Sequence, residues 1–140
     1  MNSLATVARA AQIQAHAFHN LVSGPNFLEL HEFLGDLYST YEGIFDDVVE
    51  RMIGKGMAVN PIELTAKAAQ RAGIGNNANT PMDMFRRVLT MEQAIVSAAE
   101  SENQGATLGT QNFLQGICDE SEKRQYKIKQ ILKNAATVTS

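Results

Sequence analysis

Residues 30–53 carry apolar side chains at intervals of three and four residues, and they never alternate strictly between apolar and polar. This spacing predicts an amphipathic α-helix, because residues three and four apart share a helix face. Asn26 followed by Glu29 resembles a capping box, and Gly54 and Gly56 mark the end. A single long helix is therefore expected, with apolar positions at Leu30, Phe33, Leu34, Leu37, Tyr38, Tyr41, Ile44, Phe45, Val48, Val49, Met52 and Ile53.

The rest of the chain predicts three more long helices and one short one. The run "SGP" at 23–25 ends the first helix, Pro61 lies in the first turn of the short helix, and Thr80 with Pro81 opens the next. The expected bounds are 3–22, 61–72, 80–102 and 110–134, with loops at 73–79 and 103–109 and a frayed polar tail at 135–140.

Four long helices in two pairs, joined by a mid-chain connection that carries its own short helix, predict an all-α fold. One long connection between the pairs is the connectivity of a ferritin-like four-helix bundle, here with a short extra helix in the crossover. A chain of 140 residues is the size of one domain, so residues 1–140 are expected to form a single ferritin-like domain.

Composition excludes several classes of protein. The apolar runs are too short for a transmembrane helix, so no membrane partner is expected, and the N-terminus has no apolar segment typical of a signal peptide. A single cysteine, Cys118, excludes an intrachain disulfide and fits a cytoplasmic location; a small buried hydrophobe is the favoured reading of this residue. The formal net charge of −3 calls for no nucleic-acid partner.

The three histidines and two spaced carboxylates are the candidate chemistry. His16 and His19 lie three residues apart and share a face, as do Asp46 and Glu50, which lie four apart. Imidazoles together with carboxylates suit a first-row divalent metal, and this mixture with open positions suits iron. The alternative is that the histidines pack or cap helices and that the carboxylates form a solvated face.

Distance limits how these groups can cooperate. His31 and Asp46 lie on one predicted helix, so at 1.5 Å per residue their backbones are about 22 Å apart. A metal–ligand bond of about 2 Å cannot bridge that separation within one chain. Either the two groups are unrelated, or a two-fold axis across the middle of this helix brings the histidines of one subunit to the carboxylates of another.

The run "HAFHNLVSGPNFLELHEFLGDLYSTYEGIFDDVVERMIGKG" resembles the signature of the Dps mini-ferritins, the DNA-binding proteins from starved cells. The shared elements are a His ending the first helix, a G-x-x-F turn, Leu-His-Glu opening the second helix, and Asp-x-x-x-Glu-Arg before a Gly-rich end. The resemblance implies a cytoplasmic homododecamer that oxidises Fe(II) with peroxide or oxygen, stores the ferric mineral and protects against oxidative stress. It implies a ferroxidase site holding iron (Fe²⁺/Fe³⁺) through His19 and His31 of one subunit and Asp46 and Glu50 of another.

Several positions depart from the family pattern. Gly35 stands where the family usually has an Asp ligand, and residues 105–112 lack the acids that line an entry pore in many relatives. These departures predict a reduced rate or a single bound metal; the alternative is a structural or DNA-associated shell whose ferroxidase activity is weakened or lost. His16 is expected to support the site rather than to bind metal.

Direct DNA binding is possible but not favoured. Relatives that bind DNA often carry tails rich in Lys and Arg, whereas Arg9 is the one basic side chain of the first fourteen residues here and the last six residues are uncharged. The one basic cluster, at 123–133, follows acidic residues directly and is expected to be a solvated helix face.

Overall fold

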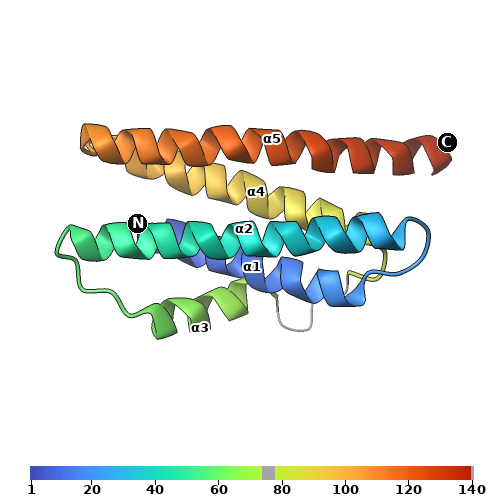
Figure 1. Ribbon diagram of the computed structural model, residues 1–140, viewed down its shortest axis with the longest axis horizontal. Helices are drawn as coiled ribbons and strands as arrows, with labels where there is room; N and C mark the ends of the chain where they lie inside the picture. The colour runs from blue at the N-terminus through green and yellow to red at the C-terminus, as the bar shows by residue number, and fades with distance from the viewer. Residues whose placement is uncertain (74–77, 140) are drawn as a thin grey trace. The chain divides into compact units, whose positions relative to one another are not determined.

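The computed structural model describes residues 1–73 and 78–139, and these form five helices with no strand (Figure 1). Contacts divide the chain into two compact units, 1–77 and 78–140. The predicted order of four long helices with one short helix between the pairs is confirmed. The bounds are α1 Asn2–Leu21, α2 Phe27–Gly54, α3 Pro61–Arg71, α4 Pro81–Asn103 and α5 Leu108–Thr139.

The first unit is a hairpin of α1 and α2, with α3 packed on α1. The two long helices run antiparallel along each other in Figure 1. Their packed faces follow the predicted spacing, because α2 buries Leu30, Leu34, Leu37 and Tyr41 in successive turns. Along α1 the buried residues include alanines that recur at the same spacing: Ala5, Ala8, Ala11 and Ala15.

The helix starts follow the sequence signals at two positions and differ at a third. The Asn60 side chain accepts hydrogen bonds from the amides of Ile62 and Glu63, and the Thr80 side chain accepts one from the Asp83 amide. Asn26 does precede α2, but its side chain makes no capping hydrogen bond, so the predicted capping box is wrong. Its backbone is left-handed, with φ of 63°, whereas a capping side chain needs the extended conformation.

The second unit is an antiparallel hairpin of α4 and α5. Inside it, Glu92 is fully buried and accepts hydrogen bonds from the Ser121 hydroxyl at 2.7 Å and from the Arg124 guanidinium at 2.6 and 3.1 Å. These bonds give a buried carboxylate the charge partner that it needs, and they fix the register of the two helices.

The last helix is longer than predicted at both ends. It begins at Leu108 instead of 110 and continues to Thr139 instead of 134. No glycine or proline follows Asn134, so the predicted frayed tail has no residue that would stop a helix. The predicted loop at 73–79 falls largely on residues 74–77, outside the described residues. None of the helices in the described ranges combines the length and apolarity that crossing a membrane requires.

Candidate metal centre

His19 and His31 form the most closely paired group of candidate ligands. The last turn of α1 carries His19 and the first turns of α2 carry His31, so the turn between the helices brings their rings together. The rings stack with centroids 3.7 Å apart and planes 19° apart. The expected clustering of these two histidines near the turn is confirmed.

Each of these histidines donates a hydrogen bond to the backbone of the other. His19 Nδ1 lies 2.7 Å from the carbonyl oxygen of His31, and His31 Nδ1 lies 2.7 Å from the carbonyl oxygen of His19. A carbonyl only accepts, so Nδ1 carries the proton in both rings. In a neutral ring this tautomer has its lone pair on Nε2, which is how histidines that bind metals are usually held.

An aromatic row continues from this pair along the hairpin. The ring of Phe27 stacks on His31 with centroids 5.0 Å apart, and Tyr38 meets His19 edge-on at 5.3 Å. His16 stacks on Tyr38 at 4.2 Å, while its ring centroid is 6.4 Å from that of His19. His16 therefore reaches the pair through Tyr38, and its supporting role stays a prediction.

Asp46 and Glu50 lie on an exposed face of α2, beyond its midpoint. Neither carboxylate has a hydrogen bond or an ion pair with any described residue. Fifteen residues of one continuous helix separate Asp46 from His31, which is about 22 Å at 1.5 Å per residue. Within residues 1–73 and 78–139, no three His, Cys, Asp or Glu side chains are close enough to hold a metal ion. One chain brings the two histidines together but leaves the two carboxylates apart from them.

Gly35 fits against the His19 ring. A methyl group built on Gly35 would lie 3.2 Å from Cε1 and 3.3 Å from Nδ1 of His19, which is tighter than ordinary carbon contacts. The glycine therefore gives His19 the space to reach the carbonyl of His31. It also leaves this position of the face without a carboxylate.

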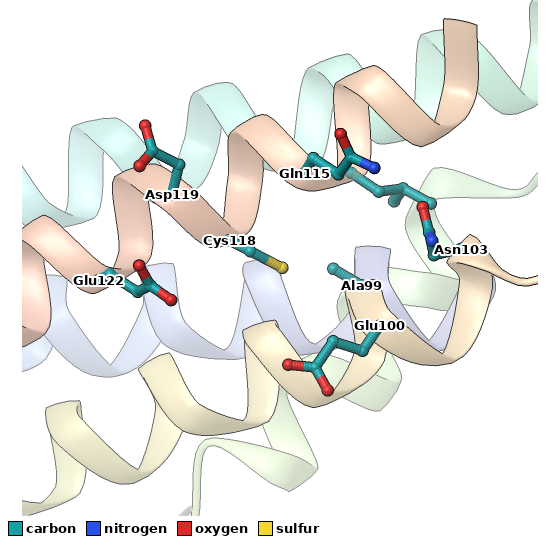
Figure 2. A pocket seen from close by; sticks show the side chains of 8 residues that line it. Ala99, Glu100, Asn103, Gln115, Cys118, Asp119 and Glu122 are labelled. Atoms are coloured by element: carbon teal, nitrogen blue, oxygen red, sulfur yellow. The ribbon is translucent and has the colours of Figure 1, made fainter. Parts of the chain in front are cut away.

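The second unit has a cleft of about 400 Å³ between α4 and α5 that contains Cys118 (Figure 2). The thiol is half-buried, so the expected small buried hydrophobe at Cys118 is only partly buried. Burial, followed by the charges of Glu100 and Glu122, raises the pKa of Cys118, which keeps the thiol protonated. A protonated thiol is a poor nucleophile. The described His, Cys, Asp and Glu side chains of this cleft form no group that could hold a metal ion.

The comparison with known protein families shows which family the chain belongs to. A family profile described as ferritin-like domain matches residues 1–138. The chain belongs to the ferritin-like domain family. The match and the helices confirm the predicted all-α, ferritin-like fold class with a short extra helix. The match runs through both compact units, and their assignment to a single domain stays a prediction.

Three curated relatives place the chain among the Dps-like mini-ferritins of this family. A nutrient stress-induced DNA-binding protein of Synechococcus is 34% identical over 131 residues, which cover 86% of this chain and 70% of the relative. A DNA protection during starvation protein 2 of Bacillus anthracis is 26% identical over 125 residues, which cover 84% of this chain and 83% of the relative. A protein of the same name from Deinococcus radiodurans is 30% identical over 138 residues, which cover 94% of this chain and 56% of the relative.

The sequence reasoning missed a polar chain beside the aromatic row of this mini-ferritin. Arg9 donates to Gln12, and Gln12 donates to Glu42, which lies one helical turn before Asp46. The signal was a shared spacing: Gln12 and His19 lie seven residues apart, and so do Gly35 and Glu42. In two antiparallel helices, residues at equal intervals meet in pairs, so the contact of His19 with Gly35 implies one of Gln12 with Glu42. The metal-binding roles of His19, His31, Asp46 and Glu50 stay predictions.

Proposed function

We propose that the chain is the subunit of an iron-oxidising and iron-storing cage, a homododecamer in which Fe(II) is the substrate. The ions are oxidised by peroxide or oxygen at sites between two-fold related subunits, and the ferric product is stored inside. The observation that carries this proposal is the reciprocal pair of hydrogen bonds that leaves Nε2 of both His19 and His31 free to bind a cation.

A second copy of the chain supplies what one copy lacks. An antiparallel pairing of two α2 helices about an axis near their middle places His19 and His31 beside Asp46 and Glu50 of the partner subunit. The same operation creates the reverse site, so each pair of subunits has two equivalent sites. The exposed positions of both carboxylates leave them available to a neighbour.

The donor set fits Fe(II) as a substrate. Carboxylate oxygens and imidazole nitrogens are ligands that iron accepts, and two carboxylates neutralise the charge that rises on oxidation. The histidines orient the ion through ring nitrogens whose tautomer the backbone fixes. Each Fe(II) gives up one electron, so the two electrons that reduce one peroxide to water come from two ions.

Protection from oxidative damage follows from removing Fe(II) and peroxide together, and the names of two relatives refer to DNA protection in starvation. Direct DNA binding is not part of the proposal, because three of the basic side chains contact other groups of the same chain. The Arg9 guanidinium lies 3.6 Å from the centre of the Phe45 ring, Lys123 pairs with Asp119 and Glu120, and Arg124 pairs with Glu92.

The test is iron oxidation in a variant that keeps the histidines. Fe(II) with hydrogen peroxide should produce a ferric absorbance rise in the native protein, and the double change Asp46→Asn and Glu50→Gln should abolish it. Asp47→Asn is the matched control, because Asp47 is also exposed on α2 but lies about 100° around the helix from Asp46. Native mass measured alongside should give the dodecamer for all three proteins. An unchanged rise in the double variant would rule out the assigned site.

Gly35 favours a second candidate, an assembled shell with little oxidation activity. This candidate expects native mass of a cage but no ferric absorbance rise above that of a protein-free control. It also expects Gly35→Asp to create oxidation activity. The close contact between a side chain at position 35 and the His19 ring argues against this outcome, because the ring would have to move.

A further inference from the structure

The carboxylate of Glu42 is held in place by a chain of contacts from α1. Gln12 Nε2 donates to Glu42 Oε2 at 2.8 Å, and Arg9 Nη1 donates to Gln12 Oε1 at 2.6 Å. The Arg9 guanidinium in turn lies on the Phe45 ring at 3.6 Å. Because arginine can only donate, it fixes the orientation of the Gln12 amide, and the amide fixes one oxygen of Glu42.

Glu42 shares its helix face with the candidate ligands. At about 100° per residue, positions 31, 35, 42 and 46 of α2 fall within about 60° around the helix axis. Glu42 is exposed on this face, while Gly35 lies two turns earlier. The α1 side chains follow the same interval, since His19 lies against Gly35 and Gln12 binds Glu42.

In one of two registers, the proposed pairing brings Glu42 to the position that lacks a carboxylate. If His31 faces Asp46 of the partner subunit, the axis crosses α2 between residues 38 and 39; if it faces Glu50 of the partner subunit, the axis crosses between 40 and 41. Rotation about the first axis brings Gly35 opposite Glu42 of the partner subunit, and rotation about the second brings it opposite Asp46 of the partner subunit. With the first axis, the space that Gly35 leaves open therefore lies opposite Glu42 of the partner subunit.

We infer that Glu42 supplies, from the partner subunit, the carboxylate that Gly35 cannot supply, and that it completes a position for a second Fe(II) ion. This inference rests on the proposed function. Glu42 and Asp46 lie about 6 Å apart along the helix, at 1.5 Å per residue. Paired metal ions are commonly about 3.5–4 Å apart, so carboxylates one turn apart can serve neighbouring ions. Gln12 is the positioning residue, because it leaves the other oxygen of Glu42 free to bind.

Cobalt binding tests the inference without relying on turnover. Co²⁺ titrated into the intact assembly reports bound ions by its visible absorbance, and it needs no oxidant. The native protein and the Asp47→Asn control should bind about two Co²⁺ per subunit, whereas Glu42→Gln should bind about one. Gln12→Met keeps every carboxylate but removes the anchor, so it should weaken the second binding step by about 10- to 100-fold.

The outcomes separate this inference from the proposed function. Equal Co²⁺ binding by the native protein and Glu42→Gln overturns the role of Glu42, as does a native protein that binds one ion per subunit. If Asp46→Asn loses Co²⁺ while Glu42→Gln does not, the proposed function stands and only the inference fails. If neither variant loses Co²⁺, both fail. Should Glu42→Gln not assemble, Gln12→Met decides, because unchanged binding in that variant also overturns the inference.

Discussion

Alanine at Gly35 and at Gly43 should change the stability of this protein by different amounts. Both glycines lie inside α2, where alanine is normally better than glycine by about 1 kcal/mol. A methyl group at Gly43 meets nothing within 4 Å, so Gly43→Ala should gain that amount. A methyl group at Gly35 would lie 3.2 Å from the His19 ring, which must move away from it.

The displacement of His19 sets the size of the difference. The ring is held by its 2.7 Å hydrogen bond to the carbonyl of His31, and a lost hydrogen bond of this kind costs about 0.5–1.5 kcal/mol. That cost offsets the gain in helix propensity. Gly35→Ala should therefore leave the free energy of unfolding nearly unchanged, about 1 kcal/mol below that of Gly43→Ala.

Urea unfolding of both variants and the native protein, at equal subunit concentration, measures this difference. Cobalt titration of the same samples adds a second readout, because a shifted His19 ring moves Nε2 away from the cation while Gly43→Ala leaves it in place. The reasoning is refuted if Gly35→Ala stabilises the protein as much as Gly43→Ala does and binds Co²⁺ like the native protein.

Two further predictions concern the second unit. Arg124→Met removes the ion pair between the guanidinium and the buried Glu92 and should cost about 3–5 kcal/mol of unfolding free energy. Lys123→Met should change the urea midpoint little, because the ion pairs of Lys123 are exposed to solvent. The raised pKa of Cys118 lowers its thiolate fraction at any given pH, so iodoacetamide should modify it more slowly at pH 8 than a free cysteine peptide. Glu122→Gln removes one cause of the raised pKa and should speed this alkylation; equal rates in the two proteins would contradict the assigned cause.

The helices could be predicted from the sequence because their signals are local. Apolar spacing, Pro61, Thr80 and Pro81 fix their type and starts within a short stretch of chain. The failures arose where a local signal was ambiguous. Asn26 has the right type for a cap, yet the turn after Gly24 requires a left-handed backbone there, and no residue after Asn134 stops the last helix.

The candidate site was predictable in part. The turn predicted between the first two helices placed His19 near His31. Helix rise alone separated both histidines from Asp46 and Glu50. The reciprocal hydrogen bonds, the ring contact at Gly35 and the anchored Glu42 depend on how α1 packs against α2. Side-chain packing between helices is set by many weak contacts at once, so no short motif contains it.

The carbonyl that His31 binds belongs to the last turn of α1, where backbone oxygens have no amide donor further along the helix. His31 thus closes the end of a neighbouring helix whether or not any ion is present. Relatives that had lost the iron chemistry would still be under selection to keep this imidazole. Asp46 and Glu50 would not be, because they make no hydrogen bond or ion pair with a described residue. Among relatives, the presence of the two acids should therefore indicate retained iron-oxidation activity better than the presence of the histidines does.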